Sequence, residues 1–123
     1  MKGYIIDTVK GTHGEINCNG DLQSYCDAIN CDYIDIAYRQ IDGVGFDIVR
    51  NAEGLLRYNP VISAMDKNGN IMLVGSLLFF HHNDNGEFTS LSDEDIVLLK
   101  KHVHTYTHMT TGETIHVMVG VEY

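Results

Sequence analysis

The stretch from Gly45 to Pro60 constrains the fold more than any other, because an apolar run stops at an Asn-Ala-Glu-Gly tetrad and restarts beyond it. The side chain of Asn51 can bond the main chain of its own turn, and Gly54 can adopt a positive φ without steric cost. Pro60 has no amide proton and is therefore excluded from a central strand. The stretch predicts a strand, a turn and a second short strand, on which the rest of the chain is expected to pack.

Further strands are predicted on both sides of this stretch. Residues 4–9 and 15–18 are predicted to form an opening hairpin, and residues 31–39 a half-buried strand with Ile34 and Ile36 on one face. The Asn-Gly pair within residues 66–70 indicates another tight turn. Beyond that turn lies the most apolar run of the chain, which predicts the central strand.

That central strand is predicted to span Ile71 to Phe80. Gly75 lies inside the run and marks a position where the strand is expected to bulge or to let another backbone approach closely. A strand that is apolar on both faces is typical of the middle of a sheet that is covered on both sides.

Two helices are predicted from their start signals. Asp21 is the expected N-cap of a helix near residues 21–30, and Ser92 is the expected N-cap of a helix near residues 93–103. Asp95 occupies the third helical position after Ser92, as in a capping box. The expected inner stripes are Leu22, Tyr25, Cys26 and Ile29 in the first helix, and Ile96, Leu99 and Val103 in the second.

The C-terminal segment is predicted to form a β-hairpin or an extended arm. Residues 105–109 and 114–121 flank a Thr-Thr-Gly-Glu connection, and apolar residues alternate cleanly in the second strand. Such a strand would aggregate as an exposed edge, so we predict a homo-oligomer in which residues 103–123 act as an oligomerisation arm. The expected fold class is α+β, a single domain over residues 1–123 with an antiparallel sheet meander of five or more strands and two helices.

Composition excludes several classes of function. Seventeen acidic and eight basic side chains give a formal charge of −9, which disfavours general nucleic-acid binding. No apolar run approaches the ~20 residues that span a bilayer, so neither a membrane partner nor a leader is expected and the cytoplasm is the expected compartment. Cys18, Cys26 and Cys31 lack the spacing of a metal or redox motif and are predicted to be buried free thiols.

Histidines in the second half of the chain offer a candidate metal site. His102, His104 and His108 lie close together in sequence, and a three-residue hairpin loop would place His108 opposite His116. Zinc or nickel could then be bound between imidazoles. Because no established ligand spacing is present, surface or interface histidines are the favoured interpretation, and no metal or other cofactor is predicted.

A catalytic function finds little support among the motifs. His108-Met109-Thr110 matches the His-x-Thr element that two-histidine phosphoesterases contain twice, but no second copy exists in the chain. A serine nucleophile elbow and a Walker loop are also absent from the sequence. We therefore predict no catalytic residues and expect a protein that is not an enzyme.

Several segments together carry a family resemblance. Residues 22–99 resemble the domain-of-unknown-function family 3846 of small phage and mobile-element proteins. The segments that carry the resemblance are Leu22-Gln23, Tyr33-Ile34-Asp35, Asn51-Ala52-Glu53-Gly54, Tyr58-Asn59-Pro60, Val74-Gly75-Ser76 and Leu91-Ser92-Asp93-Glu94. Residues 103–123 lie outside the resemblance, which implies no catalytic residues.

The resemblance implies an accessory protein that counters bacterial defence. One hypothesis is the sequestration of a small nucleotide immune signal, such as a cyclic dinucleotide or a cyclic ADP-ribose isomer, in a pocket of an oligomer. Aromatic faces would stack on the base and guanidiniums would bind the phosphates. The residues proposed for this role are Arg39, Arg50, Arg57, Phe79, Phe80 and Tyr106.

Two alternatives remain open at this point. The protein could inhibit a host defence protein through an acidic face, or it could be an enzyme that acts on nucleotides through the unpaired His108 element. The acidic residues in question are Asp84, Glu87, Asp93, Glu94 and Asp95.

Overall fold

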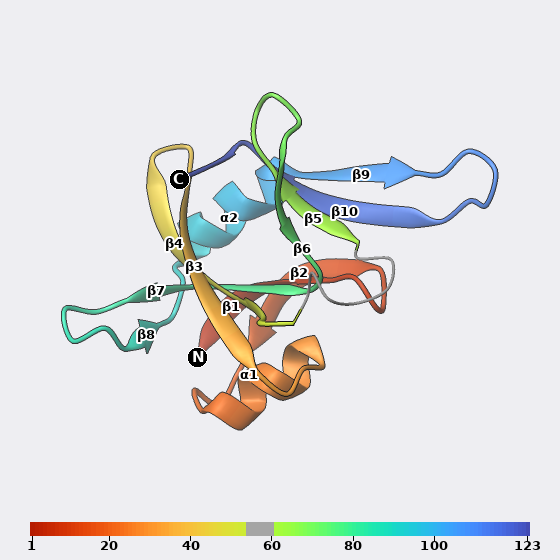
Figure 1. The fold of residues 1–123 in the computed structure, drawn as a ribbon. Helices are drawn as coiled ribbons and strands as arrows, with labels where there is room; N and C mark the ends of the chain where they lie inside the picture. The colour runs from red at the N-terminus through yellow and green to blue at the C-terminus, as the bar shows by residue number, and fades with distance from the viewer. Residues whose placement is uncertain (54–60) are drawn as a thin grey trace.

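Two sheets and two helices make up the computed structural model, which describes residues 1–53 and 61–123 (Figure 1). The first sheet has the order β11 (Val121–Glu122), β3 (Ile34–Ile41), β4 (Val44–Asn51), β7 (Leu77–His82), β1 (Lys2–Asp7) and β2 (Thr12–Asn17), with β8 (Phe88–Thr89) beside β7. The second sheet has the order β6 (Ile71–Val74), β5 (Ile62–Met65), β10 (Thr114–Val119) and β9 (Val103–Thr107).

The predicted fold class is confirmed. The first sheet is antiparallel and contains the predicted opening hairpin of β1 and β2 and the meander of β3 and β4. Among the strand pairs of the described residues, the one parallel pair is β10 with β5, in the second sheet. This pair joins the C-terminal part of the chain to its middle.

Both predicted helices are present and begin where the sequence indicates. In α1 (Leu22–Ile29), the side chain of Asp21 accepts a hydrogen bond from the amide of Ser24 at 2.8 Å. In α2 (Asp93–His102), Ser92 and Asp95 exchange side-chain and main-chain hydrogen bonds as a capping box. Leu22 was predicted in the inner stripe of α1, but its side chain is 60% exposed. Side chains of a helix tilt toward its N-terminus, so that of the first residue projects past the packed region.

The first sheet is packed on both faces. On one face Tyr4 and Phe79 join Leu99 of α2 and Met118 of the second sheet in the main core. On the other face Phe80 packs with residues of α1 and its neighbours. The prediction that the apolar run supplies a central strand is therefore confirmed for β7, which lies between β4 and β1.

The prediction of one continuous strand from Ile71 to Phe80 is wrong. The run is divided into β6 and β7, which belong to different sheets. Gly75 lies at the corner with φ +77°, a conformation that favours glycine, and its amide donates to the carbonyl of Val61 at 2.8 Å. Gly75 is thus the point where the chain crosses between sheets rather than a bulge within one.

Ile34 and Ile36 share one face of β3, as the alternation predicts, but this face is only partly covered. Ala37 is buried against the main core, whereas Ile36 on the opposite face is 50% exposed. The reason lies in α1, which packs on β4 and β7 and leaves the adjacent part of β3 open. A pattern within one strand does not reveal how far a helix on the sheet reaches.

The turn that begins at Asn51, within the stretch from Gly45 to Pro60, is confirmed as far as the structure describes it. The side chain of Asn51 accepts a hydrogen bond from the amide of Glu53 at 3.0 Å. Residues 54–60, which include Gly54, Pro60, the predicted second short strand and Arg57, lie outside the described residues.

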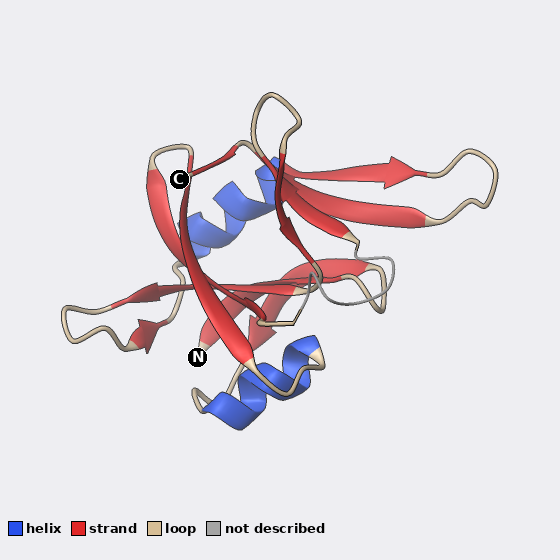
Figure 2. Cartoon of the chain, in the orientation of Figure 1, coloured by secondary structure: helices blue, strands red, loops and turns tan. Residues whose placement is uncertain are grey.

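The C-terminal hairpin is present, but it is not a detachable arm. Strand β10 lies between β5 and β9, and Val117, Met118 and Val121 are fully buried within the same chain. The β9–β10 hairpin extends away from the rest of the molecule (Figure 2), and its buried part is the base, where Val117 and Met118 lie. Burial in the chain itself explains the alternating residues, so the argument that a second subunit must cover them no longer holds, and the homo-oligomer stays a prediction.

Candidate functional site

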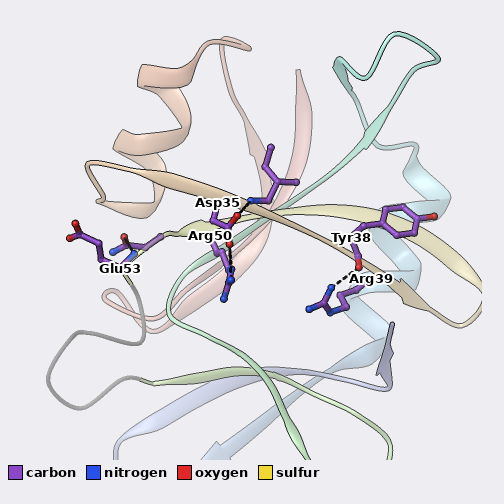
Figure 3. Close-up of polar contacts among 7 residues, drawn as sticks. Asp35, Tyr38, Arg39, Arg50 and Glu53 are labelled. Atoms are coloured by element: carbon purple, nitrogen blue, oxygen red, sulfur yellow. Dashed lines mark hydrogen bonds and ion pairs between the residues drawn. The ribbon is translucent and has the colours of Figure 1, made fainter.

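Two of the predicted arginines lie on one face of the β3–β4 pair. The register places Arg50 opposite Asp35 and Arg39 opposite Phe46. Figure 3 shows both guanidiniums on the same side of the ribbon. Arg50 donates from Nε and Nη2 to Oδ2 of Asp35 at 3.0 and 2.6 Å, and this hydrogen bonding lowers the pKa of Asp35. The charge of Arg50 is therefore already balanced within the protein.

Arg39 has a different environment. Its Nη1 donates to the carbonyl of Tyr38 at 2.8 Å, and its guanidinium carbon lies 4.6 Å from the centroid of the Tyr123 ring. The Nε atom is buried without a hydrogen-bond partner. No carboxylate of the described residues forms an ion pair with Arg39. Arg39 is thus a cation beside an aromatic face, and because its Nε is buried, hydrogen bonds to a ligand would have to come from its Nη atoms.

The structure does not bring the predicted aromatic residues to this place. Phe79 and Phe80 are fully buried on opposite faces of β7, where Phe79 packs edge-on against Tyr4 and Phe46, and Phe80 packs against Tyr25. Neither ring is available to stack on a ligand. Tyr106 is 44% exposed but belongs to β9 of the other sheet.

A cavity of about 300 Å³ adjoins Arg39 through Tyr123. It lies between the β5–β6 turn and the C-terminal residues and has both apolar and polar walls. Sequence reasoning missed this place because no local pattern shows that the Asn-Gly turn meets the end of the chain. The cavity is lined by Asp66, Lys67, Asn68, Met72, Val121, Glu122 and Tyr123.

A second cavity of about 520 Å³ lies between the β1–β2 hairpin and α1. Its lining includes the acidic residues Asp7, Glu15 and Asp27 but only one cation, Lys10. Such a charge balance opposes a phosphate. The smaller cavity also has two carboxylates in its wall, Asp66 and Glu122, but Lys67 beside them and the adjoining Arg39 offset their charge. The smaller cavity is therefore the better candidate for an anionic ligand.

The three-residue loop that would place His108 opposite His116 is not formed. Residues 108–113 form a longer connection, and the register places His116 opposite Thr105. His108 is used within its own turn, where its Nδ1 lies 3.2 Å from the amides of Thr110 and Thr111. The part of the chain that the structure describes contains no group of three side chains that could hold a metal ion.

Part of the predicted acidic face is committed to internal contacts. Asp93 forms an ion pair with Lys2, and this hydrogen bond lowers the pKa of Asp93. Asp95 completes the capping box and lies 2.9 Å from Nε2 of His81. Asp84, Glu87 and Glu94 are exposed and make no ion pair with the described residues.

Cys18 and Cys26 are free thiols, as predicted. Cys18 and Cys26 are buried, and Cys31 is partly buried. Burial raises the pKa of the Cys18 thiol, which makes this group a poor nucleophile near neutral pH.

The fold and the cavity define a small α+β protein with an open pocket flanked by one guanidinium and one aromatic ring. The chain belongs to the family described as Domain of unknown function (DUF3846), whose model matches residues 1–104. The match confirms the resemblance and extends it to the N-terminal hairpin. No curated protein and no solved structure matches the chain. No helix among the described residues is long and apolar enough to span a membrane.

Proposed function

We propose that the protein is a non-catalytic anti-defence protein of phage type that sequesters a small nucleotide immune signal in the host cytoplasm. The ligand class is a cyclic dinucleotide or a cyclic ADP-ribose isomer. The observation that carries the proposal is Arg39, a guanidinium without a carboxylate partner among the described residues, stacked on Tyr123 at the side of a cavity. A phosphate would accept hydrogen bonds from Arg39, while the ring of Tyr123 offers a surface for a base.

The charge of the whole protein does not prevent such binding. Although the net charge is −9, screening limits the influence of exposed charges to roughly 10 Å at physiological salt. Arg39 and Lys67 are cations near the cavity, and the guanidinium matches the planar geometry of two phosphate oxygens. An arginine keeps its proton at all physiological pH values. Arg39 is therefore suited to binding a phosphate rather than to transferring a proton.

Arg39→Gln is expected to weaken nucleotide binding by about 10- to 100-fold, since a hydrogen bond to a charged group contributes about 1.5–3 kcal/mol. The protein is mixed with a panel of cyclic dinucleotides and cyclic ADP-ribose isomers, and the free ligand is measured before and after denaturation. Lys101→Gln removes the same charge from the exposed end of α2 and serves as the matched control. Depletion followed by recovery of intact ligand supports sequestration.

Two outcomes would contradict the proposal. A change in the mass of the recovered ligand would support the enzyme alternative. Equal binding by Arg39→Gln and Lys101→Gln would remove Arg39 from the site.

Inhibition of a host defence protein is the second candidate function, and the exposed, unpaired carboxylates of Asp84, Glu87 and Glu94 favour it. If no ligand in the panel is depleted, we expect a basic host protein to co-purify with the chain. Replacing these three residues by Asn, Gln and Gln should then release that protein, whereas Asp93→Asn, at a carboxylate already paired with Lys2, should retain it.

A further inference from the structure

A pair of histidines joins the two sheets at a place far from the candidate cavity. His13 on β2 and His116 on β10 approach with ring centroids 4.6 Å apart. The Nε2 atom of His116 also lies 2.9 Å from the carbonyl of Gly11, so β10 contacts both the turn and the second strand of the first hairpin. The β1–β2 hairpin and β10 belong to different sheets, whose strands are labelled in Figure 1.

Both ring nitrogens of His116 have hydrogen-bond partners. A carbonyl oxygen only accepts, so Nε2 must carry the proton that it donates to Gly11. Nδ1 lies 2.9 Å from Oγ1 of Thr105, whose hydroxyl can donate to a neutral ring or accept from a protonated one. These two hydrogen bonds hold the ring of His116 in place beside His13.

The ring of His13 is hydrogen-bonded within the first sheet. Its Nδ1 lies 2.5 Å from the hydroxyl of Tyr4, and burial raises the pKa of Tyr4 to about 12. The phenol is therefore protonated near neutral pH and can donate to Nδ1 of His13 when that nitrogen carries no proton. A proton on Nδ1 would compete with this donor.

The surroundings of His13 oppose a positive charge. Burial lowers the pKa of His13, and His116 from β10 and Lys100 from α2 lower it further. Tyr4 of β1 is hydrogen-bonded to His13, and Thr105 of β9 is hydrogen-bonded to His116. Glu15 follows two residues later on β2, yet the net shift is downward, so this carboxylate does not offset burial and the neighbouring cations.

We propose that His13 and His116 form an acid-sensitive latch between the two sheets. While both rings are neutral they hold the β1–β2 hairpin against β10, and protonation in mildly acidic solution places like charges in contact and separates them. The folded form binds a proton on His13 less readily than the open form does. The latch is therefore fully closed above about pH 6.5, the ordinary pKa of histidine, and weakens as the pH falls below it.

The proposal is tested by urea unfolding of the full chain at pH 7.5 and pH 5.5. We expect the midpoint of the wild-type protein to fall on acidification, and His13→Gln and His116→Gln each to reduce that fall by half or more. His104→Gln changes an exposed histidine of β9 outside the latch and should retain the wild-type fall. If the two latch variants keep the full pH dependence, the proposal is overturned.

A second measurement covers the case in which a latch variant does not fold. In an NMR titration of the wild-type protein, the amide signals of residues 11–13 and 114–117 should shift together between pH 7.5 and pH 5, while those of the β5–β6 turn stay in place. Independent titration of the two groups of signals, or no shift in either, would overturn the latch. Neither test involves a nucleotide, so its outcome is separate from that of the proposed function.

Discussion

Replacing Phe79 by alanine is expected to lower the free energy of unfolding by about 3–5 kcal/mol, as for other large aromatic side chains truncated in a core. The ring is fully buried in the central strand β7 and packs edge-on against Tyr4 and Phe46. Removing it leaves a cavity where three aromatic side chains meet. Chemical denaturation monitored by circular dichroism would measure the loss.

A substitution at the exposed Tyr106 is the control for the loss of core packing at Phe79. Because Tyr106 is 44% exposed on β9, Tyr106→Ala should change stability by no more than about 0.5 kcal/mol. Phe79→Leu preserves most of the apolar volume, so its loss of stability should lie between those of Tyr106→Ala and Phe79→Ala. Equal stability of the Phe79→Ala and wild-type proteins would mean that β7 is not the centre of the core.

Deletion of residues 103–123 is expected to abolish cooperative unfolding. The deletion removes β9, β10 and β11, so β5 loses its parallel partner and β3 loses its pairing with β11. It also removes Val117, Met118 and Val121, which are fully buried. Burial of such side chains contributes about 1.5–3 kcal/mol each, so the loss approaches or exceeds the ~5–15 kcal/mol by which a typical domain is stable. Differential scanning calorimetry would show no transition.

A shorter change provides the control for this deletion. Replacing residues 108–113 by a two-residue Asn-Gly turn preserves the register of β9 and β10 and removes only an exposed connection. This variant should unfold cooperatively. A folded monomer after deletion of residues 103–123 would show instead that the second sheet is dispensable.

Features that depend on neighbouring residues could be predicted from the sequence. The capping box of Ser92 and Asp95 and the N-cap at Asp21 each involve groups within three residues, and both helices begin as predicted. The opening hairpin and the β3–β4 pair follow from alternation and turns in the same way. Local chemistry decides these elements, so tertiary context leaves them unchanged.

Features that depend on distant partners could not be predicted. Gly75 stands out in the sequence as a glycine inside an apolar run. Whether such a glycine bends a strand or sends the chain into another sheet depends on the strands with which the following residues pair. The approach of Tyr123 to Arg39 and of His116 to His13 joins residues more than 80 positions apart. For the candidate site, the sequence indicated Arg39 from its charge but gave no sign of the cavity beside it.

The position of β10 and β11 has a consequence for the order in which the chain folds during its synthesis. The sheet that contains the N-terminal hairpin is completed on one edge by Val121 and Glu122, and its main core includes Met118. Chains emerge from the ribosome at about 5–20 residues per second, and pairing between distant segments is slow because a long loop must close first. The helices and the β1–β2 hairpin can therefore form during translation. Neither sheet can reach its final packing until residues 114–122 have emerged, so completion of the fold must await the last strands.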